Sequence, residues 1–562
     1  MKVLTFDLET ENHRLYKRLA APFDPRNYVV EAGWSFNGGK RFSQRWEAVH
    51  REHFMVNEFN SLEKGDVICG FNIKFDLMWC WSNPALQAAL KRGVTIYCGQ
   101  YAEYLLGGMV QEVQMCSMNG IAEKYGGGCK LDAVKEMWED GYLTSEIPAD
   151  MLHDYLVGDD GELVGDIQNT WLIYCGQVRR MLNHFPKEFR TMFKHRMDGL
   201  LATTEMEWNG MYIDAVRGAT LQAEVSSQLD SATKELEQFI PALPDGMTFN
   251  WNSNVHKSCL IFGGTAKYEK WKAHEPEAYA QKTVAFPLFG GAVFVKECVA
   301  CTAGRVIRKG NTFYLVQDTF KGGQKVGQPK TKNIQVDDHT KRKGAITDFF
   351  FKFEGFTTAK PKWKGAKTDA NDEPLYSVGA DVIEELAKRK VPFTDALAKQ
   401  TSLSKDLTTY YWAIDKKGVK KGMLTLVNGD GIIHHTLHHV KTVTSRMSAS
   451  DPNMQNIPRA GTSKIKQVFT SRFGEQGRMA EIDYSQLEVV IQGVLTEDKQ
   501  LCQDLRDRVD FHCKRLATKE GLKYEDVLRW CKGDEIPEWV NKRTKAKIFS
   551  FQRAYGAGVN TI

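Results

Sequence analysis

The stretch MKVLTFDLET, residues 1–10, sets the fold of the first part of the chain. Its alternating and then continuous apolar residues predict a β-strand that ends in acids, Asp7 and Glu9. Because side chains two apart on a strand leave the same face, both carboxylates can reach one cation. An Asp-x-Glu spacing alone is common surface charge, so a metal site needs further carboxylates.

Two later acids extend this set. Asp76 lies in DVICGFNIKFDLMWC (66–80), a pattern that predicts a short strand leading into a helix, and Asp166 lies in GDIQNT (165–170). Four hard oxygen ligands suit Mg²⁺ or Mn²⁺. Two such ions, ~3.5–4 Å apart, activate a water and stabilise the leaving oxygen in phosphodiester hydrolysis. The acids therefore predict a two-metal hydrolytic site.

The composition sets the broad class. With 562 residues, 42% of them apolar, the chain exceeds what one hydrophobic core supports, so we expect two or more domains. The net charge of +5 is only mildly basic. No apolar signal segment opens the sequence, and no apolar run approaches the ~20 residues that span a bilayer. We therefore expect a cytoplasmic, soluble protein with no membrane partner.

The order Asp-x-Glu, Asn-x-x-x-Asp and a later Asp resembles the DEDD 3′→5′ exonucleases that proofread for DNA polymerases. The resemblance covers about residues 1–182. It implies that Asp7, Glu9 and Asp76 are catalytic metal ligands, together with one further acid.

The fourth acid has two candidates. In the family it follows a Tyr by four positions, and Tyr155 followed by Asp159 keeps that spacing. Asp166 instead keeps the Thr four residues later, Thr170. We take Asp166 as the ligand and Tyr155 as the residue that orients water, with Asp159 as the alternative.

The middle of the chain has a different texture. Between Arg305 and Lys343 there are ten cations and three acids, separated by Gly, Thr and isolated aromatics. This pattern predicts loops or a twisted β-ribbon with a basic face. A solvated surface excursion and a set of phosphate contacts both remain open for it.

A second polar constellation lies in TVTSRMSASDPNMQNIPRAGTSKIKQVFTS, residues 442–471. Its long polar side chains can donate to the minor-groove acceptors that all base pairs present in a similar way, although an ordinary Asn- and Ser-rich loop has the same composition. The candidate DNA-binding residues are Arg446, Asn453, Gln455 and Asn456.

Downstream, RMAEIDYSQLEVVIQ (478–492) predicts an apolar strand that ends at Asp483 and passes into a helix bearing Glu488. A carboxylate at such a strand end is where a metal ion and a triphosphate can meet. The last helical segment repeats a functional side chain at every fourth residue, which places two cations and two aromatic rings on one face. These residues are Arg543, Lys547, Phe551 and Tyr555.

The motifs TSRMSASDPNMQNIP, DYSQLE, DFH (510–512) and R-x3-K-x3-F-x3-YG together resemble the family A DNA polymerases, of the bacterial DNA polymerase I type and of phage members in particular. The resemblance runs over the whole chain. It implies an α/β fold, with an RNase H-like exonuclease domain followed by the thumb and partial palm and fingers of a right-hand polymerase. The implied domains are the exonuclease at 1–185, palm start and thumb with a basic insertion at 186–430, and incomplete palm and fingers at 431–562.

The resemblance also implies roles for individual residues. Asp483 would be a catalytic metal ligand, and Glu488 would crowd the ribose 2′ position. Arg543 and Lys547 would hold the phosphates of the nucleotide, Phe551 would face its sugar, and Tyr555 would stack at the template–primer end. One departure is Ser445, because the family usually has Gly before the Arg of this loop.

The implied cofactors are two Mg²⁺ (or Mn²⁺) ions per active site, and the implied partners are a DNA primer–template, dNTPs and a processivity factor. In the family a second catalytic carboxylate lies well downstream of the YG motif, and only six residues follow Gly556. We therefore expect a split or truncated polymerase whose palm is completed by a second polypeptide. The alternatives are a stand-alone 3′→5′ exonuclease with a relic polymerase module, and a non-catalytic DNA-binding subunit.

Overall fold

The computed structural model of the chain forms two compact units, Met1–Thr470 and Ser471–Ile562. The expected domain boundaries at 185 and 430 both lie inside the first unit. A membrane-crossing helix, which must be both long and apolar, does not occur among the described residues. The structure describes residues 1–15, 18–46, 54–128, 132–159, 164–274, 278–287, 305–309, 312–316, 319–321, 323–328, 330–415, 417–458 and 461–558.

The first unit begins with a mixed five-stranded sheet, in the order β5-β4-β1-β6-β7. The central strand β1 pairs antiparallel with β4 and parallel with β6, so the chain crosses over between β1 and β6. The strands are β1 (Val3–Thr10), β4 (Val29–Phe36), β5 (Arg41–Arg45), β6 (Val67–Gly70) and β7 (Thr95–Cys98).

Helices pack against this sheet and form the largest core with it. Residues of β1 up to Phe6 are buried, whereas Asp7 and Glu9 are half-buried, so the apolar part of the strand anchors the sheet and the acids lie at its edge. The main helices here are α2 (Ile73–Cys80), α4 (Gly99–Leu106), α7 (Ala149–Val157), α8 (Asp166–His184) and α10 (Lys194–Asn209).

A second hydrophobic core lies in the helical middle of the chain, where α12 and α13 each contribute three buried side chains. The strands β9 and β14 enter this core only at their inner ends, through residues such as Ala266 and Phe353. The helices are α11 (Ala215–Glu237), α12 (Asn254–Phe262), α13 (Ala380–Lys388) and α14 (Thr394–Thr409).

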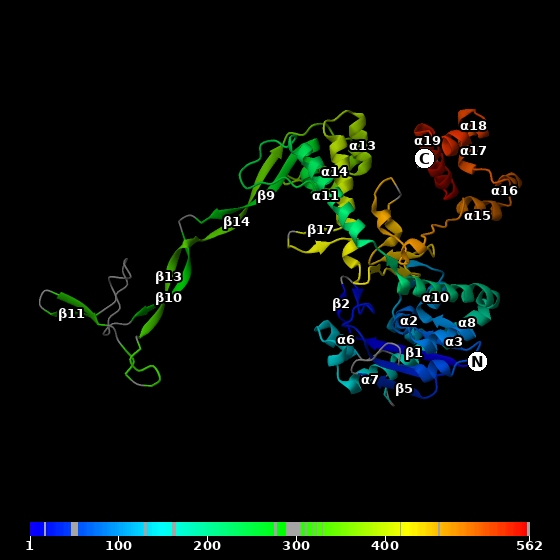
Figure 1. The fold of residues 1–562 in the computed structure, drawn as a ribbon, viewed down its shortest axis with the longest axis horizontal. Helices are drawn as coiled ribbons and strands as arrows, with labels where there is room; N and C mark the ends of the chain where they lie inside the picture. Colours follow the sequence, from blue (N-terminus) through cyan, green and yellow to red (C-terminus); the bar gives the residue numbers. More distant parts are fainter. Residues whose placement is uncertain are drawn as a thin grey trace. The chain divides into compact units, whose positions relative to one another are not determined.

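Between α12 and α13 the chain forms two-stranded antiparallel ribbons (Figure 1). The sequence pattern predicted either loops or a β-ribbon for the basic stretch, and its described residues form a ribbon. Its strands are β9 (Gly264–Ala273), β10 (Tyr279–Pro287), β11 (Arg305–Lys309), β12 (Thr312–Val316), β13 (Thr331–Arg342) and β14 (Gly344–Phe353).

The second unit is helical in its described residues. Its small core centres on α17 and on the segment that follows it. The strand expected at 478–483 does not form, because the described residues of this unit contain no strand that could pair with it, and Ile482 is 92% exposed. The helices are α15 (Leu487–Thr496), α16 (Lys499–Arg506), α17 (Phe511–Glu520), α18 (Tyr524–Leu528) and α19 (Pro537–Ala554).

Candidate active sites

Three carboxylates converge at the edge of the N-terminal sheet. Asp7 and Glu9 on β1 and Asp166 at the start of α8 each offer an oxygen, and these oxygens lie within 4.8 Å of one another. Asp7 and Glu9 are half-buried, and Asp166 is buried. Three anionic oxygens at this spacing suit a hard divalent cation. The donor set therefore fits Mg²⁺ or Mn²⁺.

A glycine permits this convergence. Gly33 on β4 lies opposite Asp7 in the β1–β4 register. A Cβ at Gly33 would lie 3.1 Å from Ile167 Cγ1 and 3.2 Å from Leu156 Cβ, which is tighter than normal packing. The missing side chain thus lets the start of α8 approach the sheet closely, and Asp166 approaches with it.

Asp76 lies next to this group but is held differently. It is on α2 and buried, and its Oδ1 accepts a hydrogen bond from the Leu8 N–H at 3.3 Å. Burial raises the pKa of Asp76 well above its usual value, and the charge of Asp7 raises it further. Asp76 is thus close enough to the β1 acids to sense their charge, although it is not one of the three converging ligands.

The two other nuclease candidates lie on and after α7. The Tyr155 ring packs edge-on against Trp138, with centroids 5.7 Å apart. Asp159 follows the helix and is exposed. The structure therefore brings Asp166, and not Asp159, to Asp7 and Glu9.

The candidate DNA-binding loop is closed by a short hairpin of β20 (Thr436–His438) and β21 (Ser448–Ser450). Arg446 is exposed in this loop, and its carbonyl oxygen accepts a hydrogen bond from the Thr442 hydroxyl at 2.6 Å. Thr442 in turn accepts at its carbonyl from the Tyr104 hydroxyl of α4, at 2.6 Å. The loop is therefore fixed to the N-terminal part of the unit.

The other three loop residues follow β21 and are exposed, with polar contacts that hold a local turn. Asn453 Oδ1 accepts from the Gln455 N–H at 3.1 Å, and Gln455 Nε2 donates to the Met447 carbonyl at 3.0 Å. The Asn456 carbonyl accepts from the Tyr410 hydroxyl at 2.6 Å. These contacts order the backbone that follows Arg446.

Ser445, which precedes Arg446, adopts a left-handed backbone with φ of 57°. The sequence departs from the family pattern at this position, where Gly is usual, and the structure explains the preference for Gly. A left-handed conformation costs an L-residue about 1–2 kcal/mol but costs Gly little. The Ser445 side chain recovers none of this cost through a hydrogen bond, because its buried hydroxyl has no hydrogen-bond partner in the structure.

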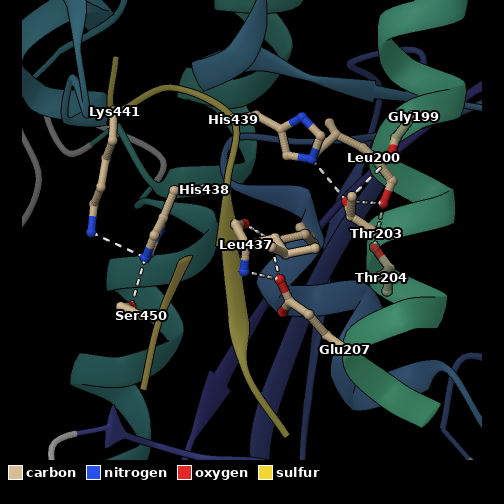
Figure 2. Close-up of polar contacts among 11 residues, drawn as sticks. Gly199, Leu200, Thr203, Thr204, Glu207, Leu437, His438, His439, Lys441 and Ser450 are labelled. Atoms are coloured by element: carbon tan, nitrogen blue, oxygen red, sulfur yellow. Dashed lines mark hydrogen bonds and ion pairs between the residues drawn. The ribbon is translucent and has the colours of Figure 1, made fainter. Parts of the chain in front are cut away.

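A buried ion pair joins the hairpin to α2. Lys74 on α2 contacts Glu207 on α10 at 2.6 Å, with side chains 13% and 1% exposed. Glu207 also accepts from the Leu437 N–H of β20 at 2.5 Å (Figure 2), and Lys74 donates to the Leu437 carbonyl. Lys74 is two residues from Asp76, so α2 carries both the lysine of this pair and one of the candidate carboxylates.

His438 and His439 directly follow Leu437, and Figure 2 shows them together with Glu207. His439 Nε2 and the Thr203 hydroxyl are 2.8 Å apart, and His438 Nε2 lies 2.8 Å from the Ser450 hydroxyl and 3.1 Å from Lys441 Nζ. Burial, followed by nearby cations, lowers the pKa of each imidazole to about 4. Both rings are therefore neutral at pH 7.

In the second unit, α19 carries the predicted stripe. Lys547 Nζ lies 5.5 Å from the centroid of the Phe551 ring, and Tyr555 follows the helix with 70% exposure. A cavity of about 490 Å³ is lined in part by Phe551, Gln552 and Tyr555. Arg543, at the start of the stripe, instead contacts a carboxylate of α17.

That carboxylate is Asp510, the first residue of the DFH motif, for which the sequence predicted no individual role. Its oxygens lie 2.6 Å from Arg543 and 2.8 Å from the Cys513 N–H, so it pairs with α19 and caps α17 at once. Burial raises the pKa of Asp510, but the hydrogen bonds from Arg543 and Cys513 and the charge of Arg543 together hold that pKa below its usual value. Arg543 is therefore positioned by a carboxylate 33 residues earlier.

His512 is a site residue that sequence reasoning missed. Its ring is 2% exposed and meets the Phe551 ring edge-on, with centroids 5.6 Å apart. Its Nδ1 is buried with no hydrogen-bond partner in the structure. The sequence signal for His512 is its position two residues after Asp510, the N-cap of α17. This position places His512 in the first turn of α17, where its ring faces α19.

Asp483 and Glu488 lie before and within the first turn of α15, and both are exposed. Gln486, between them, accepts from the Phe511 N–H at 2.8 Å and donates to the Val509 carbonyl at 3.1 Å. These two bonds bring the segment with Asp483 to the start of α17.

The comparisons with known proteins match this set of features. Residues 353–562 match the model of DNA polymerase family A. The match covers the candidate DNA-binding loop, the Asp483 segment and α19.

The relatives are DNA polymerases I. The chain is 32% identical to that of Caldicellulosiruptor bescii over 184 residues, which cover 32% of this chain and 19% of that protein. It is 30% identical to that of Treponema pallidum over 154 residues, covering 27% and 14%. The aligned part thus spans a fifth or less of these two relatives.

A solved structure shares the fold. It is the POL domain of Pol1 from M. smegmatis in complex with DNA primer-template and dNTP. The TM-score is 0.51 at 16% identity, and the likeness covers 99% of this chain and 68% of that one. The fold is therefore an α/β fold similar to a family A polymerase POL domain.

Proposed function

We propose that this chain is a template-directed DNA polymerase of family A, of phage type, with a proofreading 3′→5′ exonuclease in an RNase H-like domain at 1–185. The family A domain at 353–562 supports the polymerase half. The convergence of Asp7, Glu9 and Asp166 ahead of that domain carries the exonuclease half. In this proposal the chain acts on a DNA primer–template with dNTPs, in DNA replication.

In the proposed exonuclease, Asp7, Glu9 and Asp166 would hold the metal ions, with Asp76 behind them. Bound Mg²⁺ would supply charge for the attacking water and for the leaving 3′ oxygen. The chain's own contribution is the rigid placement of the carboxylates by β1 and α8. Tyr155 is proposed to orient the water.

In the proposed polymerase, the stripe on α19 receives the nucleotide. Lys547 and Arg543 supply positive charge for the triphosphate, and Phe551 and Tyr555 supply aromatic surface for the sugar and the base pair. Asp483 would hold the metal ion, with Glu488 near the ribose. Asn453, Gln455, Asn456 and Arg446 are proposed to contact the minor groove of the primer–template.

The nuclease half is tested with a 5′-labelled single strand and Mg²⁺. Asp7→Ala/Glu9→Ala should abolish removal of 3′ nucleotides while leaving the circular dichroism spectrum unchanged. Glu63→Ala/Glu112→Ala is the matched control, because it removes two exposed acids of the same part of the chain. Equal activity of both variants would overturn the assignment.

The polymerase half is tested by primer extension with the Asp7→Ala/Glu9→Ala protein, in which no proofreading competes. Template-directed extension that is lost on Asp483→Ala supports the proposal. Two expectations stay predictions: a second polypeptide that completes the palm, and a processivity factor. Robust extension by the isolated chain would remove the reason for a second polypeptide.

The second candidate function is a stand-alone 3′→5′ exonuclease with a relic polymerase module. One observation favours it: within the described ranges, Asp7, Glu9 and Asp166 form the single group of three or more potential metal ligands, whereas Asp483 is exposed on a segment without regular structure. Nuclease activity without detectable binding of primer–template at the C-terminal part would favour this candidate.

A further inference from the structure

The ribbon between α12 and α13 carries most of the chain's excess positive charge. Residues 264–353 contain 16 Lys and Arg against 8 Asp and Glu, a net charge of +8. The whole chain has a net charge of +5, so the remaining residues sum to −3. Cations concentrated on one extended element are typical of a surface that binds a polyanion.

The ribbon also exposes apolar side chains. On the outer part of β9 and β14 one face presents Trp271, Ile346 and Phe350, which are 51%, 70% and 57% exposed. Trp271 and Ile346 lie opposite each other in the register. A two-stranded ribbon is marginal in water by itself and gains stability when something covers it.

The cations and the exposed apolar side chains both occur at the junction where the β9–β14 pair continues into the β10–β13 pair. Backbone bonds tie this junction together, from the His274 N–H to the Lys343 carbonyl at 3.1 Å and from the Lys343 N–H to the Ala278 carbonyl at 2.6 Å. The Trp271 ring covers Gly344, where a Cβ would lie only 2.4 Å from Trp271 Cζ2. The aromatic ring is thus fixed on one face of the ribbon, and Lys272, the next residue of β9, leaves the opposite face.

The junction lysines are available to a ligand. Lys272, Lys341 and Lys343 are exposed, and none forms an ion pair within the described part of the chain. Further along the ribbon, Lys267 and Lys270 are already neutralised by carboxylates, at 2.8 Å and 2.6 Å.

We propose that this junction, Trp271 with Lys272, Lys341 and Lys343, binds the phosphate backbone of DNA and that the ribbon is a DNA-holding arm. The inference rests on the proposed function, because it assigns the arm to the same DNA. The outer part of β9, residues 267–273, spans about 23 Å, the axial length of about seven base pairs, so this part of the arm can lie along a duplex. The ligand class is DNA backbone phosphate, from either a duplex or a single strand.

The test measures equilibrium DNA binding in EDTA, where neither catalytic activity contributes. Fluorescence anisotropy of a labelled duplex of about 30 base pairs, and of the matching single strand, is followed from 50 to 200 mM salt. Each phosphate contact adds about 0.9 to the slope of log K against log salt for a duplex and about 0.7 for a single strand. The Lys272→Gln/Lys341→Gln/Lys343→Gln variant should therefore lose about 2.7 of the duplex slope, or about 2.1 of the single-strand slope.

In affinity terms, the fall from 50 to 200 mM salt should be about 40-fold smaller for the variant on a duplex, or about 20-fold smaller on a single strand. The arm holds the DNA form whose slope falls by the full amount expected for that form, about 2.7 for a duplex or about 2.1 for a single strand. A Trp271→Phe variant should weaken binding at every salt concentration without changing the slope, because the ring carries no charge.

A matched control separates contact from net charge. Lys64→Gln/Lys91→Gln/Lys187→Gln removes three exposed lysines from the N-terminal part of the same unit. Equal loss of slope in both triple variants would overturn the proposal, because total charge would then explain it. An unchanged slope in the ribbon variant would also overturn it and would leave a protein as the occupant of the exposed face. Failure of the unaltered chain to bind DNA at all would overturn the proposed function together with this inference.

Discussion

Replacing Lys74 by Met should destabilise the junction between α2 and the hairpin that carries Arg446. The Glu207 carboxylate is 1% exposed and is held by Lys74 at 2.6 Å and by the Leu437 N–H. Met fills a similar volume, but it removes the Lys74 ammonium from the buried carboxylate and leaves the hydrogen bond from the Leu437 N–H. Removing one partner of a buried ion pair costs about 3–5 kcal/mol. Because the Leu437 N–H still donates to Glu207, we expect a loss near the lower end of this range, about 3 kcal/mol.

The expected loss is local, so the assay should be local. Hydrogen exchange followed by mass spectrometry reports protection in peptides that contain α2 and β20. A loss of about 3 kcal/mol corresponds to roughly 100-fold faster exchange there, because each 1.36 kcal/mol is a factor of ten. Peptides from α17 in the second unit provide an internal reference that should not change.

Two further variants complete the argument. Glu207→Gln alone leaves Lys74 buried without its anion and should cost a similar amount, whereas Lys74→Met/Glu207→Gln removes both charges and should recover most of the loss. Lys91→Met, on an exposed helical position, should stay within about 0.5 kcal/mol. If Lys74→Met changed exchange at Leu437 by less than threefold, the buried pair would not hold the hairpin.

Further predictions concern the hairpin and the nuclease site. His438 and His439 have pKa values of about 4, below the ordinary 6.5, so the unfolded state binds more protons between these values and stability should fall as pH drops from about 6.5 toward 4; His438→Gln/His439→Gln should flatten this slope in thermal melts. Asp166→Asn should abolish Mg²⁺-dependent nuclease activity on a single strand and Asp159→Asn should retain it, and full activity in Asp166→Asn would refute the ligand assignment. Ser445→Gly should stabilise the loop by about 0.5–1 kcal/mol, seen as slower hydrogen exchange at 442–449, because it relieves the left-handed backbone.

Local patterns predicted the elements that depend on nearby residues. The strand at the N-terminus, the strand and helix around Asp76 and the helical stripe from Arg543 to Tyr555 all occur within their expected ranges. The strand expected before Asp483 does not form, because a strand is completed by its neighbours and apolar composition alone does not supply them.

Contacts between distant residues were not predictable from one sequence. Spacing left Asp159 and Asp166 as competing ligands, and the packing of Ile167 over Gly33, which brings Asp166 to the β1 acids, joins residues more than 100 positions apart. The Asp510–Arg543 pair likewise joins two helices, and neither local pattern indicates it.

The register of the ribbon has a consequence for how this protein can vary in evolution. Gly264 pairs with Phe353, so the chain leaves and re-enters the helical middle part at a single place. Segments inserted or removed beyond that pair change the reach of the ribbon without altering the order of the helices at its base. The ribbon is therefore a natural place for length variation, where descendants of one ancestor can lengthen, shorten or exchange an appendage while the helices at its base stay the same.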